Sequence, residues 1–61
     1  MSRPVIGITG NFGAAGCELA EGYYLSVSRA GAVPFIIPPV MGADSEYLDR
    51  ILDGVDALVL S

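Results

Sequence analysis

Three glycines at a spacing of three follow an apolar run, in the stretch TGNFGAAG at residues 9–16. Glycine has no Cβ, so it lets a backbone approach a ligand closely and adopts positive φ without strain. A loop of this kind at the start of a helix can bind a phosphate, because free N–H groups and the helix dipole both favour an anion. The stretch could therefore bind a nucleotide, or it could form a flexible turn between a strand and a helix.

The pattern T-G-x-x-G-x-x-G resembles the opening of extended short-chain dehydrogenases, where the glycines approach a dinucleotide pyrophosphate. That resemblance implies an acidic residue about 20 residues further on, which holds the ribose. Here the second apolar run ends in Pro38-Pro39, and no carboxylate follows before Asp44. The segment from Gly16 to Gly31 is also longer than the dehydrogenase unit allows. A phosphate loop of the G-x-x-x-x-G-K-[ST] type needs a lysine, which the chain lacks. We interpret residues 10–16 as a strand-to-helix turn and expect no cofactor.

Cys17, in the context AAGCEL, is the one cysteine of a chain that has no histidine. A nucleophilic cysteine needs a base to activate it. A nucleophile elbow also needs glycines where Ala15 and Leu19 stand. We interpret Cys17 as a small, half-buried side chain in the turn, and we expect no catalytic residue in this chain.

The remaining polar candidates favour structural roles. Asp49 and Asp53 lie four apart on a predicted helix and could hold a cation, but a solvated polar face is the commoner case, and we expect no metal site. Ser26 and Ser28 have no base nearby, and we expect them on a helix surface. Tyr23 falls on an apolar helical stripe, which favours packing in the core.

Composition excludes several classes of partner. The 61 residues carry seven Asp or Glu against three Arg, for a net charge of −4, which argues against nucleic acid and anionic membranes. The longest apolar run, residues 32–41, is too short to span a bilayer and holds three prolines. The start MSRPVIGITG lacks the apolar core of a secretory signal. We expect a cytoplasmic protein that makes no contact with nucleic acid or membrane and is compatible with a homo-oligomer.

Apolar runs alternate with helical periodicity along the chain. This order, β-α-β-α-β, predicts an α/β fold with an open parallel sheet, of the flavodoxin-like kind. We expect the sheet edges to be open and apolar, and the chain alone to be unstable or prone to aggregate. Strands buried on both faces are predicted at 4–9, 33–37 and 57–60, a turn at 10–16, and helices at 18–30 and from Ser45 to about Gly54, the second capped by Asp44 or Ser45.

Three stretches carry a second resemblance that covers nearly the whole chain: RPVIGIT at 3–9, AGAVPFIIPP at 30–39 and LDGVDALVLS at 52–61. In this order and spacing they resemble the N-terminus of the gamma-glutamyl-gamma-aminobutyrate hydrolase family, a branch of the class I glutamine amidotransferase-like hydrolases. The resemblance implies a domain of about 240 residues that hydrolyses a small gamma-glutamyl amide through an acyl-enzyme. It also implies a cysteine nucleophile, a histidine and a glutamate, all outside these 61 residues. We therefore expect residues 1–61 to be the N-terminal part of one such domain and to be inactive alone.

Two other interpretations stay open: a non-catalytic truncated product or interaction module, and a dehydrogenase fragment that binds a dinucleotide through residues 10–16. In open parallel sheets, ligands bind outside the carboxyl ends of the strands. Gly10 and Asn11 follow the first strand and Ser61 ends the third. We expect these three residues to border the active site of the complete domain.

Overall fold

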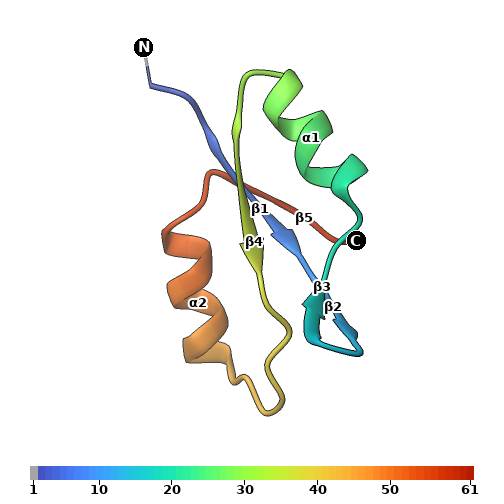
Figure 1. The fold of residues 1–61 in the computed structure, drawn as a ribbon. Helices are drawn as coiled ribbons and strands as arrows, with labels where there is room; N and C mark the ends of the chain where they lie inside the picture. Colours follow the sequence, from blue (N-terminus) through green and yellow to red (C-terminus); the bar gives the residue numbers. More distant parts are fainter. Residues whose placement is uncertain (1) are drawn as a thin grey trace.

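The computed structural model describes residues 2–61, which form one three-stranded parallel sheet, a separate β-hairpin and two helices (Figure 1). The sheet has the strand order β4-β1-β5, and β1 pairs in parallel with both neighbours. The predicted α/β class and parallel sheet are therefore confirmed. In chain order the elements are β1 (Val5–Thr9), β2 (Asn11–Gly13), β3 (Gly16–Glu18), α1 (Glu21–Arg29), β4 (Val33–Ile37), α2 (Ser45–Asp53) and β5 (Ala57–Val59).

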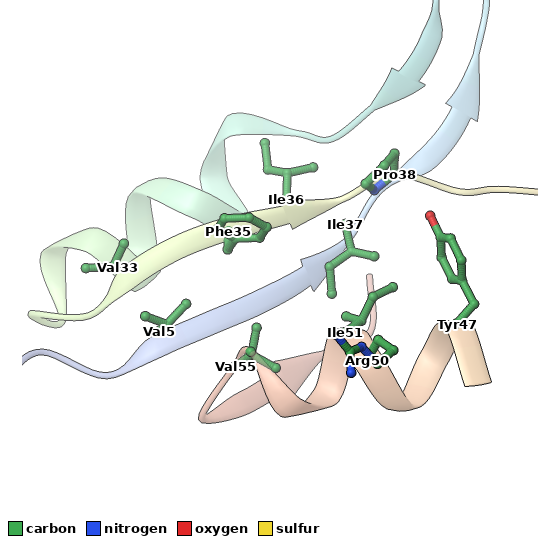
Figure 2. Close-up of a pocket in the computed structure, with 11 residues that line it drawn as sticks. Val5, Val33, Phe35, Ile36, Ile37, Pro38, Tyr47, Arg50, Ile51 and Val55 are labelled. Atoms are coloured by element: carbon green, nitrogen blue, oxygen red, sulfur yellow. The ribbon is translucent and has the colours of Figure 1, made fainter. Parts of the chain in front are cut away.

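The two helices lie on opposite faces of the sheet (Figure 2). A hollow beside α1 is lined by Tyr23, Val27 and Val59, whereas a hollow beside α2 is lined by Leu52 and Leu58. Successive residues of a strand point to opposite faces, so Leu58 and Val59 face different helices. The strand order explains why the helices lie on opposite faces. The connection from β1 to β4 and the connection from β4 to β5 cross the sheet in opposite directions, and right-handed crossovers in opposite directions place their helices on opposite faces.

Gly7, in the middle of the central strand β1, faces the α2 side of the sheet. A Cβ built on Gly7 would lie 2.8 Å from Ile37 Cδ1 and 3.2 Å from Val55 Cγ1. No side chain can be added there unless these neighbours move. The absence of a Cβ at Gly7 therefore lets Ile37 and Val55 close over the centre of the sheet.

Residues 11–18 form a β-hairpin, so the prediction of a strand-to-helix turn at 10–16 was wrong. β2 pairs in antiparallel fashion with β3, with Phe12 opposite Cys17 and Gly13 opposite Gly16. Only Gly16 of the three spaced glycines has a positive φ, of 112°, and it allows the chain to reverse between the two strands. The ladder holds Cys17 and Glu18 in extended conformation, which is why α1 begins later than the predicted residue 18.

The end of α1 and both ends of α2 follow the sequence signals closely. Gly31, with a φ of 93°, lies just beyond the end of α1 and stops it, as predicted. Asp44 is the N-cap of α2, since its Oδ1 accepts a hydrogen bond of 2.9 Å from the backbone N–H of Tyr47. Gly54 is the C-cap of the same helix.

The core is small, and this corrects the prediction that all three strands are buried on both faces. Among the described residues, Ile8 of β1 is the one apolar side chain that is completely buried. Phe35 of β4 is 59% exposed and Leu58 of β5 is 41% exposed. Tyr23, which we expected in the core, is 44% exposed. With one strand on each side, only β1 is enclosed by neighbours in the plane of the sheet and by helices above and below it.

The two edges of the sheet differ in their capacity to pair further. Val33 N–H donates to Pro4 O and Ile37 O accepts from Gly10 N–H, so residues 33 and 37 direct backbone groups toward β1. Backbone groups of successive residues point to opposite sides of a strand, so those of Pro34 point away from β1. Proline has no N–H there to donate to a further strand. No proline interrupts β5 (Ala57–Val59). The β4 edge is thus partly protected against pairing, whereas the β5 edge is open.

We predict that Gly7→Ala lowers the free energy of unfolding by about 1–3 kcal/mol, because the added methyl group overpacks the α2 face. Urea denaturation measures the change. Adding Ile37→Val, which removes the Cδ1 atom that the new methyl would meet, is expected to restore part of the loss. Gly22→Ala is the matched control, since nothing lies within 4 Å of its Cβ position. An equal effect of both glycine substitutions would contradict the close packing at Gly7.

We predict that Asp44→Ala destabilises the protein by about 1 kcal/mol, because the Tyr47 N–H loses its side-chain acceptor. Asp44→Ser is expected to retain most of the stability, since a serine oxygen can also cap the helix. Thermal denaturation of both variants, beside Asp49→Ala in the same helix, tests this. A loss for Asp49→Ala as large as that for Asp44→Ala would show that charge, rather than capping, is responsible.

Candidate functional site at the carboxyl edge of the sheet

The ends of β1 and β5 and the start of the hairpin meet at one edge of the sheet. The backbone N–H of Ser61 donates a hydrogen bond of 3.0 Å to Thr9 Oγ1, and Ser61 Oγ donates to the carbonyl oxygen of Thr9. Asn11 Nδ2 donates to Ser61 Oγ at 3.2 Å. Figure 1 shows the carboxyl end of the chain beside the start of α1 and above the hairpin. The structure therefore brings Asn11 and Ser61 together; that they border an active site stays a prediction.

Gly10 joins this edge to β4 as well. Its backbone N–H donates to Ile37 O at 2.8 Å, which extends the β1–β4 ladder by one hydrogen bond. A Cβ on Gly10 would collide with Cys17 Sγ and would lie 3.5 Å from the carbonyl oxygens of Glu18 and Ile37. Gly10 thus lies where the folded-back hairpin and the end of β4 both come close to the chain leaving β1.

Cys17 lies in β3 and is exposed, so the prediction of a half-buried side chain in a turn was wrong. It lines a shallow hollow with Asn11, Glu18, Leu19 and Ala20. Glu18 is the one ionisable residue among these neighbours, and none of them is a cation or a base that could activate the sulfur. With no histidine in the chain, nothing in this hollow pairs with the sulfur as a catalytic base.

The other polar candidates stand apart from this edge. Ser26 Oγ donates a hydrogen bond of 2.6 Å to Gly22 O within α1. Asp49 and Asp53 are exposed on α2. Within residues 2–61, no three His, Cys, Asp or Glu side chains come close enough to hold a metal ion. No helix in the described part of the chain is both long enough and apolar enough to cross a membrane.

Sequence reasoning missed an apolar groove between β4 and α2. It has a volume of about 470 Å³. Figure 2 shows Val33, Phe35 and Ile37 of the sheet along one side, and Ile51 of α2 and Val55, which follows that helix, along the other. The apolar stripe of α2 could be recognised from its helical spacing in the sequence, but the distance between this stripe and the sheet could not. Tyr47 and Arg50 are the polar side chains of the lining, and neither is a nucleophile of the kind that amide hydrolysis needs.

We predict that Gly10→Ala destabilises the protein by about 1–3 kcal/mol, because its methyl group meets the Cys17 sulfur. Cys17→Ala removes that sulfur, so the double variant is expected to recover most of the lost stability. Urea denaturation of the four proteins of this cycle gives the coupling between the two positions. If the two single effects simply add, the contact at Gly10 is not the cause.

Comparison with known proteins supports the fold and gives the family. The family model described as Peptidase C26 matches residues 4–61, which is nearly the whole chain. No curated protein and no solved structure matches the chain. The parallel order β4-β1-β5 with two helices is consistent with part of the class I glutamine amidotransferase-like fold. The chain therefore belongs to the Peptidase C26 family.

Proposed function

We propose that residues 1–61 are the N-terminal part of a cysteine-dependent hydrolase of gamma-glutamyl amide bonds, similar to gamma-glutamyl-gamma-aminobutyrate hydrolases. The observation that carries this proposal is the Peptidase C26 match over residues 4–61. The substrate is a small gamma-glutamyl amide. A cysteine thiolate attacks the gamma-carbonyl carbon, the amine leaves, and water then hydrolyses the thioester.

In this proposal the catalytic groups lie outside residues 1–61. Cys17 has no base beside it, and Ser61 Oγ already donates its proton to the Thr9 carbonyl oxygen. The contribution of this segment is structural: it supplies three parallel strands whose carboxyl ends form part of the surface of the active site. The extensive exposed apolar surface supports the proposal, because residues such as Leu58 and Leu60, 41% and 76% exposed, are suited to contact further protein.

Two other functions have less support. A dinucleotide-binding loop needs its glycines at the start of a helix, but residues 11–18 form a hairpin and α1 begins only at Glu21. A non-catalytic interaction module uses the same sheet, and activity of the full-length protein distinguishes it from a hydrolase. The cytoplasmic location and the oligomeric state stay predictions.

We predict that the full-length protein releases amine from gamma-glutamyl-gamma-aminobutyrate and not from the matched alpha-glutamyl amide, whereas residues 1–61 alone release none. Amine release is measured by chromatography. Cys17→Ser in the full-length protein is expected to keep kcat/KM within about twofold, because the sulfur is not the nucleophile. Loss of all activity in that variant would assign the nucleophile to Cys17, and an inactive wild-type protein would contradict the proposed function.

A further inference from the structure

Thr9 makes two hydrogen bonds to the same residue, 52 positions away in the sequence. Its side-chain Oγ1 accepts from the Ser61 N–H at 3.0 Å, and its carbonyl oxygen accepts from Ser61 Oγ. Asn11 Nδ2 donates to Ser61 Oγ at 3.2 Å. Both the backbone and the side chain of Ser61 are thus held by the segment that leaves β1. We call these five hydrogen-bonding groups, on Thr9, Asn11 and Ser61, the strand-exit clamp.

The clamp begins where the regular ladder ends. The pairing of β1 with β5 stops at Ile8 and Val59, and Ser61 lies two residues beyond it. Beyond the last ladder pair, the Thr9 hydroxyl accepts the hydrogen bond of the Ser61 N–H. Threonine is branched at Cβ, which restricts the rotation of this hydroxyl about χ1. The direction in which the chain leaves β5 is therefore set by side chains of the β1 end.

The hydroxyl of Ser61 is fully engaged in this arrangement. It donates its one proton to the Thr9 carbonyl oxygen and accepts from the Asn11 amide. A serine nucleophile would need a base at that proton, and a carbonyl oxygen cannot serve as one. Ser61 therefore acts as the anchor point of the clamp.

We propose that Thr9 is a positioning residue of the hydrolase, which acts through Ser61 to orient the main chain leaving β5 at the carboxyl edge of the sheet. The inference rests on the proposed function, since ligands of open parallel sheets bind at this edge. Groups placed by the β5 exit must be held closely to contribute to the reaction, because small displacements of reacting partners lower the rate strongly. Thr9 itself touches no reacting atom in this proposal.

The test compares Thr9→Val with Thr9→Ser in the full-length protein. Valine has nearly the shape of threonine but cannot accept the Ser61 N–H, whereas serine keeps the acceptor. We expect Thr9→Val to lower kcat about tenfold with KM changed less than about twofold, and Thr9→Ser to restore kcat to within about twofold of the wild type. Ser26→Ala is the control, because it deletes a hydroxyl that bonds a backbone carbonyl within α1 and is not part of the clamp. It is expected to leave kcat and KM unchanged.

Amide hydrogen exchange at Ser61 measures the clamp independently of catalysis. We expect its exchange to be about tenfold faster in Thr9→Val than in Thr9→Ser or the wild type, since the N–H loses its partner. If Thr9→Val does not fold, Asn11→Ala weakens the same clamp without altering a strand of the parallel sheet, and a fall in its kcat is then the expected result.

The outcomes separate the clamp from the proposed function. Unchanged exchange at Ser61 in Thr9→Val overturns the clamp. Faster exchange with an unaltered kcat overturns the positioning role, as does a loss in Thr9→Ser equal to that in Thr9→Val. A wild-type protein that exchanges slowly at Ser61 but hydrolyses no gamma-glutamyl amide overturns the proposed function, and with it the role of Thr9 in that reaction, while the clamp remains as a structural feature.

Discussion

The parallel pairing of β1 with strands on both of its sides is the constraint on which the rest of the structure depends. β4 matches β1 over five residue pairs, from Val5↔Val33 to Thr9↔Ile37, and β5 matches it over three. Only the central strand can bury a side chain from all directions, and Ile8 is the residue that does so. The adjacent Gly7 contributes by having no side chain, because Ile37 and Val55 occupy the space that its Cβ would need. Each helix then covers one face of this strand.

Pairing also decides what lies at the carboxyl edge of the sheet. Once the ends of β1, β4 and β5 are in register, Gly10 reaches Ile37 and Thr9 reaches Ser61. The hairpin folds back over the same edge, and Asn11 adds the third contact to Ser61. A group of small polar residues that are far apart in the sequence is thus joined by hydrogen bonds at this edge of the sheet. In a family of hydrolases, this placement suits a part of the protein that orients other groups.

The two edges of the sheet differ in their backbone donors and in the apolar side chains that lie beside them. Pro34 removes an outward donor from β4, whereas the outer edge of β5 lies near Leu58 and Leu60, which remain exposed. An edge with free donors next to exposed leucines is suited to further pairing, and an edge interrupted by proline is not. The β5 edge is therefore better suited than the β4 edge to pair with a further strand.

The sequence alone determined the alternation of the three sheet strands with two helices, the parallel sheet, the end of α1 and both ends of α2, because these depend on local signals. Periodicity marks α2, Pro38 and Pro39 end β4, and Asp44 and Gly31 cap or stop helices through contacts with near neighbours in the chain. Asn11 and Ser61 were also predicted to lie at one edge of the sheet, because the carboxyl ends of parallel strands lie at the same edge. Only the tertiary structure decided that residues 11–18 form a hairpin, since glycine spacing is compatible with a turn, a phosphate loop or two short strands. The partners of Thr9 and the groove beneath α2 likewise depend on distances between elements, which no local pattern contains.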